Sequence, residues 1–414
     1  MAKTRILYVS DSPLLNFVGQ SRVGREICFR INSEHEVSYA AFLHEGPTDG
    51  FNYPIFPIPK DQSLCPELIT AIEIVKPNVM IFSHDIWQFP YIKEIKEKWP
   101  EIKTIGYFTI DGEPLHLYFQ SIIDYCDLIL VPTRYGRRVV LDSFGYANTM
   151  ICYFGVDREI FKPIIWDKDE FKSQSDEKAR EAGKPQHIHD VSGKFNILFT
   201  GAASDKRNVA ALIEAFDQFS DKVDDALLIL LVNCYFSQST AKCGVFNIDV
   251  KSLMYECRHS DRIYEEINNH INDSQLNLVY NQADVYCLPS ANEGFSLTIL
   301  EAMACGVPVL ATNYSAMGEL VIDDYNGFKI EPNVFHRCSF NIKRAYVHPD
   351  QICSRLLEAY QRWSNKKDEY EQIRKNCLEF ASRYSWDGTA NCILRAIDVV
   401  LNNHFIVSSD FIEV

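Results

Sequence analysis

The stretch "NEGFSLTILEAMACGVPVLA" (292–311) predicts a buried helix followed directly by a buried strand. Residues 295–304 are apolar on nearly every side, which is typical of a helix enclosed by the core. Gly306 and Pro308 are residues that end helices, and the apolar run 307–311 then has the length of a strand. A helix and a strand joined this closely indicate an α/β fold.

Two carboxylates stand in this apolar setting, Glu293 just before the helix and Glu301 nearly two turns into it. The N-terminus of a helix offers unpaired N–H groups, here from Gly294, Phe295 and Ser296, and suits a phosphate group. A carboxylate on each side can accept hydrogen bonds from sugar hydroxyls. In the alternative interpretation Glu293 caps the helix and Glu301 pairs with a buried Arg or Lys, since a buried charge needs a partner.

Composition narrows the class of protein. The chain has 414 residues, 47% of them hydrophobic, which is enough for two domains with full cores. We expect a cytoplasmic protein, because the 13 cysteines are scattered without a C-x-x-C pair and neither a signal peptide nor a membrane-spanning run is evident. A net charge of −15 argues against stable nucleic-acid binding, and no basic membrane-docking face is evident.

The order of the expected elements predicts two similar units. Strands and helices alternate over residues 1–163 and again over 195–385, a pattern that indicates parallel sheets covered by helices. The charged stretch 164–194 reads as a linker or insertion, and 386–403 as a final helix. Ligands of such sheets bind at the carboxyl ends of strands, so two facing units predict one shared cleft. The segment 331–349 fits no clear element.

The segment "YNQADVYCLPSANEGFSLTILEAMACGVPVLATNYSAMGELVIDDYNGFKI" (280–330) resembles the retaining GT-B glycosyltransferases of family 4, also called glycosyl transferases group 1. It has their strand ending in P-S, then E-G-F-S-L, E-A-M-A, G-x-P-V, E-L and N-G. The resemblance implies a GT-B architecture with two Rossmann-like domains facing a central cleft. It also implies that 386–403 crosses back onto the first domain and that 155–157 lie at the hinge.

The resemblance further implies the chemistry. A hexose would move from a UDP- or GDP-linked sugar to an acceptor hydroxyl with retention, without a metal or cofactor. Glu293 looks like the family's glutamate for the donor sugar, and Glu301 like the one that holds the ribose. In "FTGAASDKRNVAALIEAF" (199–216), Lys206 and Arg207 would reach the leaving diphosphate. Here Ala202 stands where the family has an arginine. The alternative, solvated cations at a helix start, is disfavoured by the helix dipole.

The loop after the first strand, "SPLLNFVGQSRVGREI" (12–27), resembles the family's glycine-rich turn. Gly19 matches the pattern, whereas Ser21 stands where a second glycine is often found. Arg22 and Arg25 read as residues of a helix surface.

Polar residues also follow two inner strands of the first unit. Asp111 in "YFTIDGEPLH" (107–116) is a candidate to lie near the reacting sugar and the acceptor, with a turn-forming aspartate as the alternative. His84 and Asp85 end the preceding strand and could line the acceptor side; core or turn roles are equally open.

The resemblance thus implies a set of site residues. The candidate catalytic residues are Asp111, Lys206, Arg207 and Glu293, and the candidate donor-binding residues are Gly19, Gly201, Lys206, Arg207, Asn292, Glu293, Gly294, Phe295, Ser296, Leu297 and Glu301. We expect a glycan or polysaccharide acceptor. A modified nucleic-acid base or a lipid acceptor, another enzyme on this fold such as an epimerase or phosphorylase, and a non-catalytic nucleotide-sugar-binding module stay open as alternatives.

Overall fold

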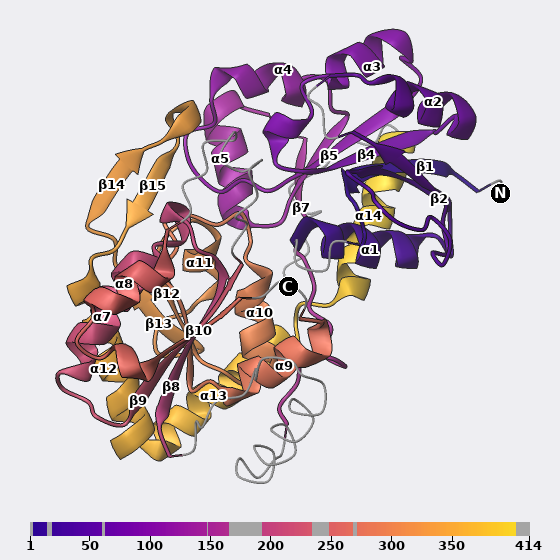
Figure 1. Cartoon of the computed structure of the whole chain (residues 1–414). Helices are drawn as coiled ribbons and strands as arrows, with labels where there is room; N and C mark the ends of the chain where they lie inside the picture. The colour runs from indigo at the N-terminus through magenta and orange to yellow at the C-terminus, as the bar shows by residue number, and fades with distance from the viewer. Residues whose placement is uncertain are drawn as a thin grey trace.

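The computed structural model describes residues 3–14, 19–59, 63–146, 148–164, 193–233, 248–267 and 271–402. Two parallel sheets lie one in each half of the chain, with helices packed around them (Figure 1). This is the mixed α/β architecture with two Rossmann-like halves that the alternation predicts. The predicted linker or insertion 164–194 lies almost wholly outside the described residues.

The first sheet has seven strands in the order β3-β2-β1-β4-β5-β6-β7. Their bounds are β1 Arg5–Asp11, β2 Glu36–Phe42, β3 Ile55–Ile58, β4 Val79–His84, β5 Lys103–Phe108, β6 Leu128–Val131 and β7 Thr149–Ile151. The helices of this half are α1 Gly19–Ile31, α2 Pro66–Val75, α3 Ile92–Lys98, α4 Gln120–Ile123 and α5 Arg134–Phe144.

The second sheet has six strands in the order β10-β9-β8-β11-β12-β13. Their bounds are β8 Phe195–Ala202, β9 Ala226–Asn233, β10 Ile263–Ile267, β11 Val285–Leu288, β12 Val309–Thr312 and β13 Gly327–Ile330. The helices that follow are α7 Val209–Ser220, α8 Val250–Glu256, α9 Asp273–Gln282, α10 Leu297–Ala304, α11 Ser315–Leu320, α12 Pro349–Asn365, α13 Lys367–Ala381 and α14 Trp386–Leu401.

Strand β1 shows why these sequences form central strands. Ile6 and Tyr8 pack into one hydrophobic cluster, while Leu7 and Val9 pack into another on the opposite face. Successive side chains of a strand point to opposite faces, so a strand covered on both faces must be apolar at every position. The first of these clusters continues into the second half of the chain, which joins the two halves through one core.

Both sheets reverse their strand order at one point. The chain leaves β1 in one direction to β2 and returns on its other side as β4, and β8 with β11 repeats this arrangement. Loops on either side of such a point diverge and leave a crevice at the carboxyl ends of the strands. The crevices belong to the loops after β1 and β4 in one half and after β8 and β11 in the other.

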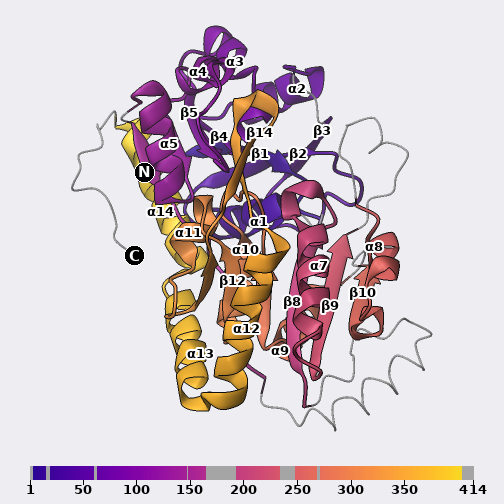
Figure 2. The ribbon, with the colours of Figure 1, turned by 90° about the vertical axis from the view of Figure 1, so that its left-hand side faces the viewer.

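Helix α14 packs against α1 and β5 of the first half, although it follows the second sheet in sequence (Figure 2). The chain leaves the first half near Val156 and returns to it near Tyr384. These two crossings lie side by side, since the Val156 N–H donates a hydrogen bond to the Tyr384 carbonyl at 3.3 Å. Gly155 lies against the backbone at the start of α14. A Cβ at this glycine would come within 2.2 Å of the Trp386 nitrogen.

The segment 331–349, for which the sequence indicated no element, contains an antiparallel hairpin. Its strands are β14 Val334–Arg337 and β15 Lys343–Tyr346, which extend from the second half toward the first (Figure 1). The sequence of β14 does not predict a strand, because all four of its residues are exposed and it lacks the alternation of apolar and polar residues that marks a half-buried strand.

Helix α10 begins two residues later than the sequence suggested. The predicted helix ran from residue 295, whereas the structure places Ser296 in the left-handed region, with φ 77°, as the residue before the first turn. Six of the eight residues of α10, from Ile299 to Ala304, are buried, as the apolar pattern predicts. Among the residues that the structure describes, no helix has the length and apolar character needed to cross a membrane.

The contact at Gly155 generates a stability prediction. We expect Gly155→Ala to lower the free energy of unfolding by about 1–3 kcal/mol, because the added methyl overlaps the backbone of Ser385 and Trp386. Chemical denaturation of both proteins measures this. Gly145→Asn is the control, since Gly145 lies at φ 63° with nothing within 4 Å of an added Cβ, and Asn tolerates that conformation. An unchanged midpoint for Gly155→Ala would contradict the close packing.

Candidate active site

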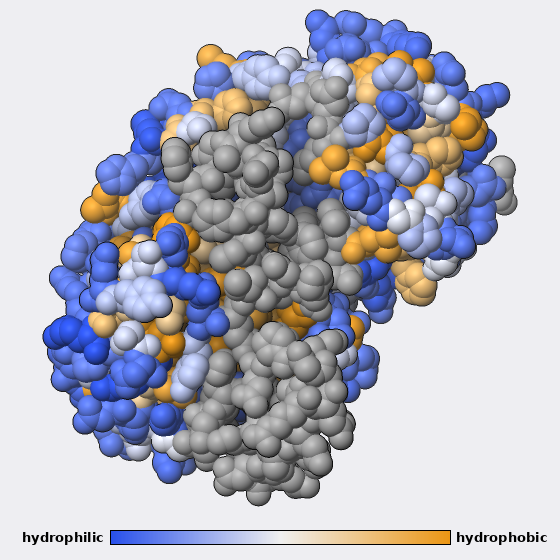
Figure 3. Space-filling model, in the orientation of Figure 1, coloured by the Kyte–Doolittle hydropathy of each residue, from blue (hydrophilic) through white to orange (hydrophobic). Residues whose placement is uncertain are grey.

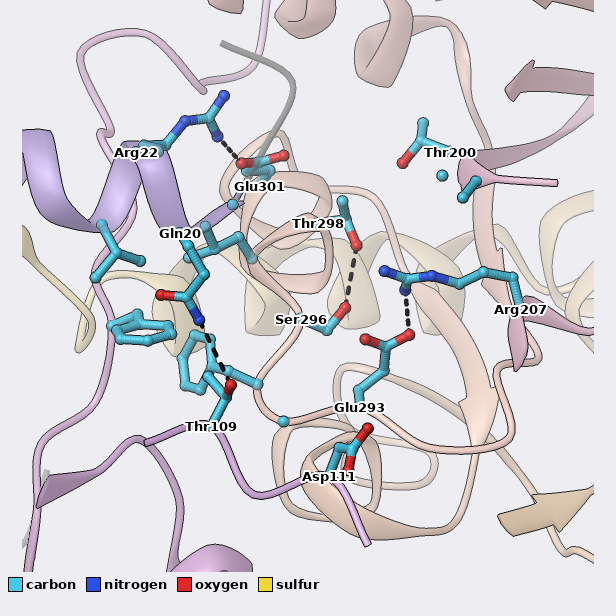
Figure 4. Close-up of a pocket in the computed structure, with 18 of the residues that line it drawn as sticks. Gln20, Arg22, Thr109, Asp111, Thr200, Arg207, Glu293, Ser296, Thr298 and Glu301 are labelled. Carbon is cyan, nitrogen blue, oxygen red and sulfur yellow. Dashed lines mark hydrogen bonds and ion pairs between the residues drawn. The ribbon is translucent and has the colours of Figure 1, made fainter. Parts of the chain in front are cut away.

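A cleft of about 440 Å³ lies where the carboxyl ends of the two sheets meet. Both halves contribute to its walls (Figure 4). The predicted site residues that line it are Gly19, His84, Asp85, Asp111, Gly201, Lys206, Arg207, Glu293, Gly294, Phe295, Ser296, Leu297 and Glu301. Asn292 is the exception: it is buried next to Gly112 and is not among the described residues that line the cleft.

Glu301 on α10 is buried and holds two partners. Its carboxylate forms an ion pair with Arg22 of α1, which crosses from the other half, and accepts a hydrogen bond from the Tyr280 hydroxyl at 2.9 Å. Burial raises the pKa of Glu301, while Arg22 and the Tyr280 hydroxyl act in the opposite direction. Arg22 also pairs with Asp273 at the start of α9. The structure therefore contains the buried ion pair of the alternative interpretation, and Glu301 is at the same time one of the residues that line the cleft.

Arg22 is not the helix-surface residue that the sequence predicts. Its side chain is only 12% exposed and lies between two carboxylates, those of Glu301 and Asp273. A single positive charge that serves Glu301 and Asp273 binds the two halves together across the cleft.

Glu293 lies in the loop between β11 and α10 and pairs with Arg207. Its own backbone N–H donates to the Ser315 hydroxyl at 2.9 Å, which fixes the loop. The side chain does not cap α10, because no side-chain hydrogen bond caps that helix. Glu293 therefore points at the cation of the β8 loop, as Figure 4 shows.

Lys206 and Asp111 meet across the cleft, with Nζ and Oδ2 2.7 Å apart. Burial disfavours the charged form of each group, but the attraction between the two charges and their hydrogen bond outweighs this effect. The pKa of Asp111 is therefore lowered, with Arg344 adding to the effect of Lys206, and the pKa of Lys206 is raised by Asp111 and Glu293. A carboxylate and an ammonium group thus stay charged beside each other at the junction of the two halves.

The start of α10 presents backbone donors to the cleft. Within the described part of the chain, no hydrogen bond engages the N–H groups of Gly294, Phe295 and Ser296. Ser296 holds φ 77°, a conformation that costs energy in a residue other than glycine and that turns the chain into the helix. Gly294 is needed for a reason that the sequence did not reveal, since a Cβ there would lie 2.7 Å from the Thr109 Cβ of the other half.

His84 and Asp85 lie at the end of β4, on the wall formed by the first half. The His84 Nδ1 accepts the Asp85 N–H at 2.7 Å, so its Nε2 is the donor toward Asp11, 3.0 Å away. Asp85 accepts a hydrogen bond from the Thr109 hydroxyl at 2.7 Å. These bonds fix the orientation of both side chains at the cleft.

Several cleft residues escaped the sequence analysis: Gln20, Arg22, Thr109, Thr200, Asp273 and Thr298. Five of them lie within a few residues of a predicted site residue, so proximity to the loops after β1, β5, β8 and β11 was the available signal. Asp273 had none, because it lies at the start of α9, after β10, in a stretch where the sequence named no candidate residue.

Comparisons with known proteins agree with this geometry. Residues 184–350 match the family described as Glycosyl transferases group 1. An uncharacterised glycosyltransferase of Methanocaldococcus jannaschii is 32% identical over 100 residues, which is 24% of this chain and 23% of that protein. A D-inositol 3-phosphate glycosyltransferase of Xylanimonas cellulosilytica is 27% identical over 214 residues, 51% of this chain and 46% of that protein. The chain thus spans less than half the length of these curated relatives.

Among solved structures, the HepE protein of Anabaena in complex with UDP and glucose superposes with a TM-score of 0.72. The match covers 95% of this chain and 99% of that one at 14% identity. The fold is GT-B. In this GT-B chain the two sheets face each other across the cleft that contains Glu293 and Glu301. The family match and the named relatives together support a glycosyltransferase enzyme.

The buried pair of Arg22 and Glu301 generates a prediction. We expect Arg22→Ala to lower the free energy of unfolding by about 3 kcal/mol at neutral pH, because it leaves a buried carboxylate without its cation. Without Arg22 the pKa of Glu301 rises further, and a raised pKa favours the folded state in acid. The loss should therefore be smaller at about pH 5 than at about pH 8.

The matched control is Arg25→Ala on the same helix. Its side chain is 27% exposed, and its ion pairs are longer, at 3.7 and 3.8 Å. A change of less than about 1 kcal/mol is expected for this variant. Equal losses for the two variants in urea denaturation, or a loss for Arg22→Ala that does not depend on pH, would argue against the buried pair.

Proposed function

We propose that this protein is a retaining glycosyltransferase that moves a hexose from a nucleotide-diphosphate sugar to an acceptor hydroxyl, with a glycan-type acceptor. The observation that carries the proposal is the convergence in one cleft of Lys206, Arg207 and the start of α10 with the carboxylates Glu293 and Glu301. Cations and free N–H groups suit a diphosphate, and carboxylates suit the hydroxyls of a ribose and a hexose. The scattered cysteines, all free where described, favour a cytoplasmic location.

The donor would lie along α10. The ribose hydroxyls would bind Glu301 and displace part of its contact with Arg22, and the diphosphate would lie between the helix N-terminus and Lys206 with Arg207. The hexose would then reach Glu293. The HepE structure, which contains UDP and glucose, supports a uridine donor in particular. In this arrangement residues 195–385 form the donor domain, while 1–163 with the helix 386–403 form the acceptor domain.

The chemical step follows from these positions. The bond between the anomeric carbon and the leaving phosphate oxygen breaks, and its electron pair stays on that oxygen. The acceptor oxygen forms the new bond on the same face and passes its proton to the leaving phosphate. Lys206 and Arg207 stabilise the negative charge that develops there. Asp111, on the wall of the other half, would orient the acceptor hydroxyl, and no carboxylate needs to form a covalent intermediate.

The acceptor is proposed to be a sugar or a related polyol within a glycan. One relative is named as a D-inositol 3-phosphate glycosyltransferase, and inositol is such a polyol. The wall built from His84, Asp85, Thr109 and Asp111 presents several hydrogen-bonding groups, which suit a polyhydroxylated acceptor better than a flat base or an acyl chain.

Donor hydrolysis tests the proposed function. Purified protein is offered UDP-, GDP-, ADP- and CMP-linked sugars without acceptor, and released nucleotide is measured. We expect slow hydrolysis of one donor. Glu301→Gln should weaken binding of that nucleotide about tenfold, the equivalent of one lost charged hydrogen bond.

Glu371→Gln, whose side chain is 59% exposed on α13, is the matched control and should leave nucleotide binding unchanged. If no donor is hydrolysed but a nucleotide sugar still shifts the melting temperature, the chain is a binding module rather than an enzyme. If none binds, the donor site is wrongly assigned.

Turnover should depend strongly on the two cations of the β8 loop. The double variant Lys206→Ala, Arg207→Ala is expected to lower kcat for donor hydrolysis at least about 100-fold, because the leaving phosphate loses its charge stabilisation. The melting temperature should also fall, because the buried Glu293 loses its cation, but by no more than in Arg22→Ala, since the side chains of Lys206 and Arg207 are themselves 33% and 27% exposed. The control pair Lys366→Ala, Lys367→Ala removes two adjacent exposed lysines. A melting loss without a kcat loss would indicate a structural role for Lys206 and Arg207.

A further inference from the structure

The β14–β15 hairpin is a basic element in an acidic protein. Residues 331–349 contain Arg337, Lys343 and Arg344 against the single acidic residue Glu331, while the whole chain carries −15. A local excess of positive charge beside a cleft attracts anionic ligands. The position of these charges relative to the cleft therefore decides whether they have a role there.

Strand β15 lies directly against the loop that carries Asp111. The Lys343 N–H donates to the Glu113 carbonyl of the first half at 2.9 Å. On the second half, the Ala345 N–H donates to the Ala291 carbonyl at 3.0 Å. Gly112 is packed so closely that a Cβ there would meet a hairpin side chain at 2.1 Å. The strand is thus held between the two walls of the cleft, next to both carboxylate loops.

The hairpin tip is anchored as well. The ring of Phe340 lies 5.0 Å from that of Phe119 and 6.0 Å from that of His116, measured between centroids. Tyr118 stacks nearly parallel to Phe340 at 6.5 Å. Figure 3 shows hydrophobic side chains among hydrophilic ones on the side where the hairpin reaches the first half. These contacts bridge the halves and keep β15 in a constant position beside Asp111.

The alternation of side chains along β15 directs Arg344 to one face of the hairpin. Arg344 and Tyr346 share that face, and the Tyr346 hydroxyl donates to Asp205, the neighbour of Lys206, at 2.8 Å. Arg344 is close enough to Asp111 to help lower the pKa of that carboxyl. Lys343 lies on the opposite face of the strand, so of these two adjacent cations only Arg344 shares the face of Tyr346 and acts on Asp111. Arg344 lies beside the cleft and is not among the described residues that line it.

The guanidinium of Arg344 has unused capacity to bind. Its Nε is buried, and no hydrogen-bond partner contacts it within the described residues. A buried charged donor without a partner is unfavourable, and a ligand oxygen would relieve that cost. The planar guanidinium fork fits the paired oxygens of a phosphate or carboxylate group.

We propose that Arg344 forms an anion subsite on the acceptor side of the cleft and that the acceptor carries a negatively charged oxygen group, a phosphate or a carboxylate. This inference rests on the proposed function, because Asp111 and Lys206 mark the reacting centre only if that function holds. The subsite deepens it by naming the class of acceptor: an anionic sugar rather than a neutral one. It also assigns a role to residues 331–349.

Binding of matched sugars tests the subsite. Glucose, glucose 6-phosphate and glucuronate are titrated into the full chain by calorimetry, with and without UDP. We expect at least one anionic sugar to bind about tenfold or more tightly than glucose. Arg344→Gln should remove that advantage, so that the anionic sugar binds no more tightly than glucose. Vesicles of phosphatidylglycerol form a further arm, and binding to them that Arg344→Gln abolishes would place the phosphate on a lipid.

Lys343→Gln is the matched control, since it removes the same charge from the opposite face of the same strand. It should keep the preference for the anionic sugar. If Arg344→Gln fails to fold, Arg344→Lys replaces it, and we expect a weaker preference because the charge remains but the fork is lost.

The outcomes separate the two proposals. Absent binding of anionic ligands, affinity no greater than for glucose, or an equal loss in Lys343→Gln would overturn the Arg344 subsite. If that happens while a donor is still hydrolysed, the proposed function stands and only the subsite fails. If no donor is hydrolysed or bound, the proposed function itself fails, whatever the sugars show.

Discussion

The docking of the two halves depends on a buried carboxylate that needs a cation as its partner. Glu301 lies in a helix that is otherwise apolar, and the charge that balances it comes from Arg22, on a helix of the other half. Removing either residue would leave a charge in a medium of low dielectric constant, which costs far more than the pair contributes. A second, partly exposed ion pair, Asp111 with Lys206, also joins the two halves. Correct docking of the halves is therefore tied to the neutralisation of charge inside the cleft.

In the proposed function these ion pairs prepare the cleft for a charged substrate. A nucleotide diphosphate would bring negative charge to Lys206 and Arg207 and would replace Asp111 and Glu293 as their partner. The carboxylates are then available to hydroxyl groups, which they bind well as hydrogen-bond acceptors. When the donor binds, each cation would exchange a carboxylate partner for a phosphate partner. No cation in the cleft would therefore be left without a negative partner.

The wall of the first half and the β14–β15 hairpin are the parts of this GT-B fold that would set its preference for an acceptor in the proposed function. In that function the donor side consists of loops at the strand-order reversals, which the fold itself supplies. The acceptor side would depend on a basic hairpin outside the two sheets, which is anchored by Phe340 and packed against Gly112. Function resides in such additions to a common scaffold, and the scaffold alone does not reveal the acceptor.

The sequence by itself determined the two parallel sheets, the buried helix after Glu293 and the loops that meet at the cleft, because periodicity and loop residues are local properties. Asp111 and Lys206 could be named as candidates from their positions at strand ends, but not as partners. Only the tertiary structure decided that Arg22 is buried against Glu301, 279 positions away, and that Gly294 is required by Thr109. These contacts arise when two halves dock. No local pattern encodes them, since the distance between residues far apart in the chain depends on how the whole core packs.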